Sequence, residues 1–253
     1  MNAQDSERAL WDRLRAHTRS RIGLGRAGDA LDIAAVLDLS AAHAAARDAV
    51  HSAVDADALA ASLSELGVGL VPVITSRAPD RSTYLRRPDL GRQPADLSGL
   101  HRTDPDVAIV VCDGLSARAV TDHAVPMVRA LVDALAGAAV SVVVATQARV
   151  ALGDHVAAAL GADAVVVLIG ERPGLSVADS LGAYLSYRPR PGMADSERNC
   201  VSNIHAHGVA YPRAAAVVAA LLAGAKQLGR SGVDLKDTSG DVLTEAQQAA
   251  ALG

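Results

Sequence analysis

Three clusters of polar and glycine residues each follow a short apolar run, and they are the first candidates for a binding site. The clusters are Cys112-Asp113-Gly114, Gln147-Ala148-Arg149-Val150 and Gly170-Glu171-Arg172-Pro173-Gly174. If the apolar runs are parallel strands, their carboxyl ends meet at one edge of a sheet, where ligands bind in open α/β folds. The spacing therefore predicts a polar crevice at that edge. The alternative, in which Gly114 and Gly174 only form turns, stays open.

Two carboxyl groups and one thiol in these clusters are of types suited to catalysis. Asp113 and Glu171 are candidates for an acid/base pair, although a helix N-cap and a turn carboxylate are the simpler interpretation. Cys112 is a candidate nucleophile, but no histidine adjoins it, and His123 falls about two turns into the following helix. A buried, inert cysteine is therefore favoured. A stand-alone hydrolase or transferase that uses Cys112 or Asp113 is kept as an alternative function.

Two further segments carry polar chemistry of their own. Arg198–Ile204 (RNCVSNI) surrounds Cys200 with amide and hydroxyl groups, which either organise a turn or meet a polar ligand. Arg77–Arg92 is rich in arginine and predicts a solvated or subunit-facing surface, where guanidinium groups can bind a carboxylate-bearing partner. The eight histidines include no pair at helical i, i+4 spacing with a third ligand nearby, so no zinc site is predicted.

Composition and missing motifs exclude several classes of function. The turn Asp113–Arg118 (DGLSAR) matches neither a dinucleotide-binding glycine pattern nor a phosphate loop, and Gly23-Leu24-Gly25 has no preceding strand. A formal charge of −4, with one Trp, four Tyr and no Phe, argues against nucleic-acid binding. Two cysteines cannot form a disulfide framework, which favours a reducing compartment. We find no secretory signal, and the longest apolar run, Ala214–Ala225, is shorter than the ~20 residues that cross a membrane.

The elements that must position these residues alternate along the middle of the chain. Apolar strands are expected at Asp106–Cys112, Val140–Ala145 and Ala164–Ile169, and helices follow the first two. Continuous Val and Ile runs flanked by helices are typical of a buried parallel sheet. Leu181–Tyr187 predicts a further strand, and Tyr211–Leu228 predicts a helix. The fold class is therefore α/β, with a mostly parallel sheet flanked by helices.

On this pattern the chain divides into an N-terminal helical region at residues 1–66 and an α/β domain at residues 67–253. Helices are expected over Ala3–Thr18, Asp29–Leu37, Ser40–Val54 with Ser40 as N-cap, and Ala56–Leu66. Val68–Thr75 predicts a strand at the sheet edge because it contains Pro72. Residues 76–103 form a long polar segment that is a candidate functional or interface loop.

Several motifs, taken in chain order, resemble the light (small) subunit of ethanolamine ammonia-lyase. They are Ser76-Arg77-Ala78, Asp80-Arg81, Tyr84–Arg92 (YLRRPDLGR), Asp113-Gly114-Leu115-Ser116, Gly170–Ser176 (GERPGLS), Asp179-Ser180-Leu181 and Arg198–Ile204 (RNCVSNI). The most specific feature is GERPGLS followed by RNCVSNI. With similar segments at Arg21–Gly28 and His43–Val50, the resemblance runs from about residue 20 to the tail.

The resemblance implies a carbon–nitrogen lyase that uses adenosylcobalamin to convert ethanolamine into acetaldehyde and ammonia by radical chemistry. In that family the large subunit is a TIM barrel that holds ethanolamine and most catalytic groups, and six large and six small chains assemble together. The light subunit has a Rossmann-like α/β domain that lies across the cobalamin and is not active alone. No catalytic residue and no metal ligand is therefore expected in this chain.

The family's cobalamin contacts match Val150, Glu171 and Cys200. Their chemistry suits a corrin, because Val150 can pack on the apolar ring and Glu171 can accept hydrogen bonds from its amide arms. Cys200 is then expected to be a contact rather than a cobalt ligand. A structural adaptor that never touches the cofactor is the alternative.

The resemblance also carries an expectation about location. Some relatives have a longer N-terminal extension that is associated with packaging in a protein-shelled bacterial microcompartment. This chain begins almost directly with its first predicted helix, which leaves packaging open. Because no secretory signal is found and the two cysteines favour a reducing compartment, we expect a cytoplasmic protein. The face formed by Leu10, Trp11 and Leu14 is the part that would dock on a shell or on the partner chain.

Overall fold

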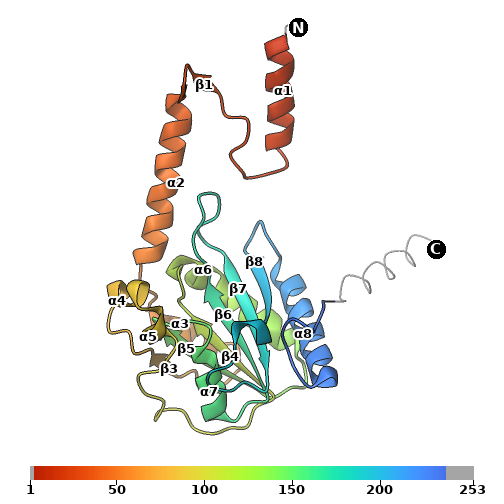
Figure 1. Cartoon of the computed structure of the whole chain (residues 1–253). Helices are drawn as coiled ribbons and strands as arrows, with labels where there is room; N and C mark the ends of the chain where they lie inside the picture. The colour runs from red at the N-terminus through yellow and green to blue at the C-terminus, as the bar shows by residue number, and fades with distance from the viewer. Residues whose placement is uncertain (1–2, 238–253) are drawn as a thin grey trace, which may run out of the picture.

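A six-stranded sheet occupies the centre of the protein in a computed structural model, which describes residues 3–237 (Figure 1). The strands are β3 (Val73–Thr75), β4 (Val107–Cys112), β5 (Val140–Thr146), β6 (Ala164–Gly170), β7 (Leu181–Tyr187) and β8 (Asn199–Ile204). They lie in the order β3-β5-β4-β6-β7-β8. The first four in this order are parallel, whereas β7 and β8 are each antiparallel to the preceding strand. The predicted α/β class with a mostly parallel sheet is confirmed.

Helices cover both faces of the sheet because its central strands are apolar on both sides. Val107, Ile109 and Val111 of β4 pack into one core with residues of α3 (Ala56–Ser64), α6 (Ala117–Ala134) and α8 (Tyr211–Leu228). The alternate residues Ala108, Val110 and Cys112 pack into a second core with α7 (Leu152–Leu160). Successive side chains of one strand therefore enter opposite cores. No helix within residues 3–237 is both long and apolar enough to cross a bilayer.

The register of the sheet brings the carboxyl ends of its three central strands together. Cys112 at the end of β4 pairs with Ala145 of β5 on one side and with Ile169 of β6 on the other. Helix α6, which follows β4, and helix α7, which follows β5, pack on opposite faces of the sheet. Because the two connections diverge, a crevice forms beyond the strand ends.

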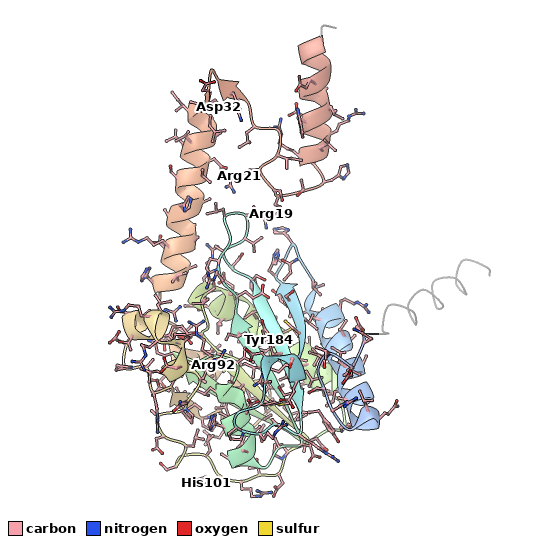
Figure 2. The ribbon with its side chains drawn as sticks, viewed as in Figure 1. Arg19, Arg21, Asp32, Arg92, His101 and Tyr184 are labelled. Atoms are coloured by element: carbon pink, nitrogen blue, oxygen red, sulfur yellow. The ribbon has the colours of Figure 1, made fainter. Side chains whose placement is uncertain are left out.

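An N-terminal arm, residues 3–51, extends away from the sheet (Figure 1). It consists of α1 (Ala3–Arg15), a small hairpin of β1 (Arg26–Ala27) and β2 (Ala30–Leu31), and α2 (Ile33–His51). Arg21 lies where the arm meets the rest of the chain (Figure 2). Its guanidinium binds Asp38 at 2.7 Å and the backbone oxygen of Leu175 at 2.8 Å. The bond to Leu175 attaches the arm to the loop after β6, whereas the bond to Asp38 joins two parts of the arm.

Helix α2 is continuous, so the predicted break between residues 37 and 40 is wrong. The helix begins after Asp32, whose side chain accepts a hydrogen bond from Ala35 N at 2.7 Å. The predicted N-cap, Ser40, lies inside the helix and donates a hydrogen bond to Val36 O at 2.8 Å. Neither glycine nor proline occurs between Asp32 and Ser40, so nothing in this stretch interrupts the helical backbone.

Two segments form elements that their sequences did not predict. Residues 76–103, expected to be a loop, contain the short helices α4 (Arg81–Arg86) and α5 (Pro88–Gly91). Arg198–Ile204, expected to form a turn or meet a ligand, contributes the edge strand β8. Most of the side chains of β8 are exposed or half-buried. This strand therefore depends on its pairing with β7 rather than on an apolar pattern of its own.

Helix α3 packs with the sheet, although it lies in the part of the sequence predicted as an N-terminal helical region. Its residues Leu59, Ala60 and Leu63 are buried in the core that contains α6 and α8. The division between residues 1–66 and 67–253 stays a prediction. The packing of α3 favours a division before residue 56.

Candidate functional site

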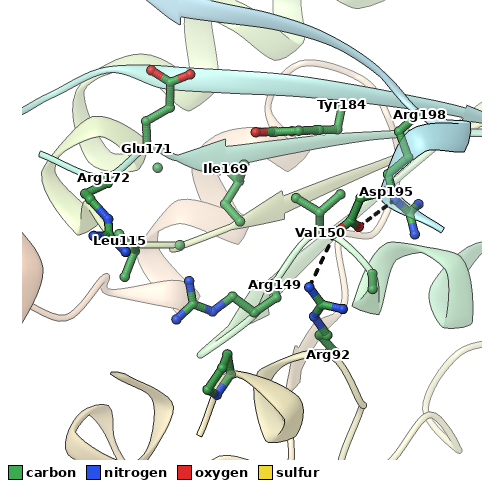
Figure 3. A pocket seen from close by; sticks show the side chains of 14 residues that line it. Arg92, Leu115, Arg149, Val150, Ile169, Glu171, Arg172, Tyr184, Asp195 and Arg198 are labelled. Atoms are coloured by element: carbon green, nitrogen blue, oxygen red, sulfur yellow. Dashed lines mark hydrogen bonds and ion pairs between the residues drawn. The ribbon is translucent and has the colours of Figure 1, made fainter. Parts of the chain in front are cut away.

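A cavity of about 630 Å³ opens at the carboxyl ends of β4, β5 and β6 (Figure 3). We call it the strand-end cavity. It is lined by residues at or just after the ends of these strands, by residues at both ends of α5, by one residue of β7 and by residues before β8: Pro88, Arg92, Gly114, Leu115, Arg149, Val150, Ala151, Ile169, Gly170, Glu171, Arg172, Tyr184, Asp195 and Arg198. The polar crevice predicted at this edge of the sheet is therefore present. Val150 and Glu171, two of the three predicted site residues, both line it.

Two glycines let the ends of β4 and β6 approach closely beside the cavity. Gly114 has a φ of +56°, and a Cβ there would collide with the backbone of Gly170. A Cβ at Gly170 would collide in turn with the carbonyl oxygens of Asp113 and Ser116. Leu115 N donates a hydrogen bond to Gly170 O at 2.8 Å across this contact. Gly114 thus forms a turn, as one interpretation had it, and that turn also builds the cavity.

Glu171 stands at the rim of the cavity, between β6 and the pair formed by β7 and β8. Its carboxylate accepts hydrogen bonds from Ser180 Oγ at 2.6 Å and from Asn203 N at 3.3 Å. Gly182 leaves room for this side chain, because a Cβ there would lie only 3.0 Å from Glu171 Oε1. The carboxylate is thereby held in position while it stays half-buried, with lone pairs left to accept hydrogen bonds from a ligand.

Val150 follows a tight turn that buried groups hold from two sides. Gln147 in this turn has a φ of +52°, which is uncommon for a residue with a side chain. Ala148 N donates a hydrogen bond to Asp113 Oδ1 at 3.0 Å, and the hydroxyl of Tyr84 donates one to Ala148 O at 3.0 Å. Because the turn is held in this way, the apolar side chain of Val150 has a defined place in the cavity lining.

Asp113 is buried behind the cavity lining and does not meet Glu171 there. Its Oδ2 forms an ion pair with Arg81 at 3.2 Å. Burial raises the pKa of Asp113, while a backbone N–H and the charge of Arg81 oppose the rise. The burial of Asp113 outside the lining therefore gives no support to Asp113 and Glu171 as an acid/base pair. The N-cap interpretation is wrong, because Ser116 caps α6 by accepting a hydrogen bond from Ala119 N at 3.1 Å.

Cys112 is completely buried at the end of β4, as expected for an inert cysteine. Burial raises the pKa of its thiol well above the ordinary value. His123 serves a different group, since its Nδ1 lies 2.8 Å from the hydroxyl of Tyr211. The geometry therefore gives no support to Cys112 as a nucleophile. Within residues 3–237, no three His, Cys, Asp or Glu side chains gather where they could hold a metal ion.

Cys200, the third predicted site residue, is not part of the cavity lining. It stands on β8 directly opposite Tyr184 of β7, so the two side chains share one face of the sheet. Tyr184 does line the cavity (Figure 3). Burial raises the pKa of Tyr184 to about 12 and also raises the pKa of Cys200, so both side chains stay protonated at neutral pH. Cys200 is therefore the cross-strand neighbour of a residue of the cavity lining, Tyr184, and is not itself part of the lining.

Arg198 is the buried cation of the RNCVSNI segment. Its two Nη atoms each donate a hydrogen bond to the carboxylate of Asp154 on α7 at 2.7 Å, and one of them also binds Ser186 Oγ at 2.8 Å. Burial alone would lower the pKa of Arg198, but the hydrogen bonds and charge of Asp154 outweigh it and raise the pKa. This ion pair fixes the start of β8 against α7 beside the cavity.

Sequence reasoning missed the roles of Arg198 and Tyr184. The Arg198–Asp154 pair joins residues 44 positions apart, and no local pattern indicates it. The alternation of Leu181–Tyr187 predicted a strand but did not indicate which face the cavity would occupy. The arginine-rich segment, expected to be a solvated or subunit-facing surface, contributes Arg92 to the cavity lining.

The chain is similar to proteins of one known family over most of its length. A profile described as "Ethanolamine ammonia-lyase light chain (EutC)" matches residues 8–236. A protein named ethanolamine ammonia-lyase small subunit from Rhodococcus erythropolis is 56% identical over 246 residues, which cover 93% of this chain and 95% of that protein. Proteins of the same name are 50% identical in Bradyrhizobium diazoefficiens, over 90% of both chains, and 49% identical in Rhodopseudomonas palustris, over 94% of this chain and 92% of that one.

Proposed function

Because the chain belongs to the ethanolamine ammonia-lyase light-chain family, we propose that it forms one wall of a cobalamin site at the interface with a large subunit. The complex would convert ethanolamine into acetaldehyde and ammonia with adenosylcobalamin as cofactor. One observation carries the proposal: Val150 and Glu171, the residues that match the family's cobalamin contacts, line a single open cavity at the strand ends.

The residues of the strand-end cavity fit part of a corrinoid. Leu115, Val150 and Ile169 offer apolar surface for the ring, and Glu171 offers an acceptor for amide N–H groups. Pockets of about 300–1,000 Å³ enclose ligands of drug size, and a corrinoid with its amide arms and nucleotide is larger than this. A cavity of about 630 Å³ can therefore cover only part of the cofactor, which leaves the rest for a large subunit to cover in this proposal.

The chain's own residues would bind and orient the cofactor and keep water away from it. Val150 would pack on the ring, and Glu171, held by Ser180 and Asn203, would accept a hydrogen bond from an amide arm. Cys200 would be a contact at the edge, beside Tyr184, and not a cobalt ligand. The chemistry that adenosylcobalamin supplies when bound is radical formation at its cobalt–carbon bond.

Exposed apolar side chains on the arm are an argument for a partner chain. Ile33 is 78% exposed and Leu37 is 64% exposed, and both lie on α2. Apolar surface of this kind on a protein named as a small subunit fits a subunit contact. That the partner is a TIM barrel, that six large and six small chains assemble, and that the complex is cytoplasmic or packaged in a microcompartment all stay predictions.

The affinity of the complex for adenosylcobalamin tests the proposal. We expect Glu171→Ala, in light chain co-expressed with its large subunit, to weaken binding by about 1–3 kcal/mol, because a ligand amide loses its acceptor. Glu65→Ala is the control, since Glu65 is exposed at the end of α3, outside the cavity lining. Equilibrium dialysis followed by corrinoid absorbance measures both.

Two results would count against a cofactor wall. Unchanged affinity in the Glu171→Ala complex would favour the structural adaptor. Turnover of ethanolamine by the purified light chain alone would favour a stand-alone enzyme.

A further inference from the structure

Arg149 lines the strand-end cavity and has no anionic partner within residues 3–237. Its guanidinium lies over the ring of Tyr84, 4.3 Å from the ring centroid. Its Nε is buried and has no hydrogen-bond partner among residues 3–237. No ion pair joins it to any described carboxylate, whereas Arg92 and Arg198, which also line the cavity, bind Asp195 and Asp154. Arg172, the fourth arginine of the lining, is exposed and likewise has no ion pair with a described residue.

The neighbouring carboxylates are already engaged. Asp113 accepts a hydrogen bond from Ala148 N at Oδ1 and pairs with Arg81 at Oδ2. Glu171 is held by Ser180 and Asn203 on the far rim. A buried cationic donor that finds no acceptor costs more than an unmade neutral hydrogen bond. The donors of Arg149 are therefore available to a group from outside this chain.

The side chain of Arg149 is held in one orientation by its surroundings. Its backbone N–H donates a hydrogen bond to Gly91 O at 2.8 Å. Gly91 also makes room for the side chain, because a Cβ at that position would lie 3.0 Å from Arg149 Cγ. Tyr84, whose ring stacks on the guanidinium, is completely buried. A guanidinium held in this way loses little freedom when it binds a ligand.

The chemistry of the available group indicates its partner. A planar guanidinium pairs best with a carboxylate or phosphate, which can accept two parallel hydrogen bonds. The amide arms of a corrinoid are neutral, and its one peripheral anion is the phosphodiester that joins the ring to the nucleotide base. Resting on the cobalamin function proposed above, we propose that Arg149 is a positioning residue that binds this phosphodiester at the strand-end cavity.

Three corrinoid probes test this proposal with the complex of light and large chains. Adenosylcobalamin contains the phosphodiester and base, cobinamide phosphate contains a phosphate without the base, and cobinamide contains neither. We expect Arg149→Gln to weaken binding of the first two about tenfold to a hundredfold, and to change binding of cobinamide less than about twofold. Equilibrium dialysis with corrinoid absorbance gives each Kd without any measurement of turnover.

The control is Arg188→Gln. Arg188 is also stacked on a tyrosine, 5.5 Å from the ring centroid of Tyr187, but it is exposed and follows the end of β7 away from the cavity. All three affinities should be unchanged in this variant. If Arg149→Gln does not fold, Arg149→Lys is the variant to measure instead, because it keeps the positive charge and loses the paired donors. We expect it to weaken only the two phosphate-bearing probes, by a smaller factor.

The outcomes separate this inference from the proposed function. Equal loss of all three corrinoids in the Arg149 variants would overturn the phosphate contact, and so would no loss of any. Weaker association of the two subunits, with corrinoid affinities unchanged, would assign Arg149 to a carboxylate of the large subunit instead. A wild-type complex that binds none of the three probes would contradict the cobalamin function itself.

Discussion

At Asp113, burial and the neighbouring charge of Arg81 have opposite effects on the pKa of the carboxyl group. Its carboxylate is buried, yet it anchors the turn before Val150 and pairs with Arg81. Burial raises its pKa above the ordinary value of 3.8, so the folded chain holds this proton more tightly than the unfolded chain does. The stabilisation from this group is fully present below pH 3.8 and is lost as the pH rises through the raised pKa.

We therefore predict that Asp113→Asn changes how stability depends on pH. As the pH rises from about 4.5 to about 7.5, wild-type protein should lose free energy of unfolding relative to the variant, because only the wild type must ionise a buried carboxyl group. Urea unfolding at several pH values measures the difference.

Asp96→Asn is the control for this prediction. Hydrogen bonds from Ser98 lower the pKa of Asp96, so its contribution to stability is present above the ordinary pKa and is lost as the pH falls. Its difference from wild type should therefore stay nearly constant between about pH 4.5 and about pH 7.5, and it should change with the opposite sign only below the ordinary pKa of an aspartate. The same slope in both variants would contradict the effect of burial at Asp113.

Among the secondary-structure elements, the ends of β4 and β6, rather than the strands themselves, determine the shape of the strand-end cavity. The Val and Ile runs indicate β4 and β6 without reference to the rest of the chain, because continuous β-branched residues are typical of buried strands. The close contact between their ends depends on Gly114 and Gly170, which lie 56 positions apart by their numbering. Only the parallel register of the two strands brings these glycines together.

We predict that Gly170→Ala destabilises the protein and Gly174→Ala does not. The added methyl group at residue 170 meets the carbonyl oxygens of Asp113 and Ser116, which cannot move away, and overpacking of this kind costs about 1–3 kcal/mol. At Gly174 the nearest atom is 3.5 Å away, an ordinary contact, so the change should stay within about 0.5 kcal/mol. Urea unfolding compares the two. Equal effects would show that the close approach at residue 170 is unimportant.

The whole molecule consists of a body built on the sheet and an arm that touches it at few places. Within α2 the only buried residue is Ala49. The described contacts of the arm with the body include the bonds of Arg21 to Leu175 O and of Arg81 to Val50 O. Helix α3, in contrast, places Leu59 and Leu63 in the core of the body. The pattern of buried residues therefore places the boundary between arm and body between α2 and α3.

Two truncations test where the body begins. We expect removal of residues 1–54 to leave the cooperative unfolding of the body intact and to weaken its association with the large subunit, because the exposed apolar side chains of α2 are lost. Removal of residues 1–66 should destabilise the body strongly, since each lost core leucine is worth about 2–5 kcal/mol. Urea unfolding measures stability, and gel filtration with the large subunit measures association. Equal stability of the two chains would place the division at residues 66/67.

Local patterns in the sequence determined the central strands, helix Tyr211–Leu228 and the place of Val150 and Glu171 beyond the strand ends. These features follow from residues that are neighbours in the chain, where side-chain periodicity and burial act directly. The motifs also indicated the family, because they occur in order along the chain.

Only the tertiary structure decided the features that depend on distant partners. Strand β8 exists because β7 pairs with it, and the Arg198–Asp154 ion pair joins residues from different elements. The same holds for Arg149, which has no anionic partner among the described residues, since Asp113 pairs with Arg81 and other groups hold Glu171. Whether a charged group is paired depends on which other groups fold around it, and neighbours in the sequence do not determine that.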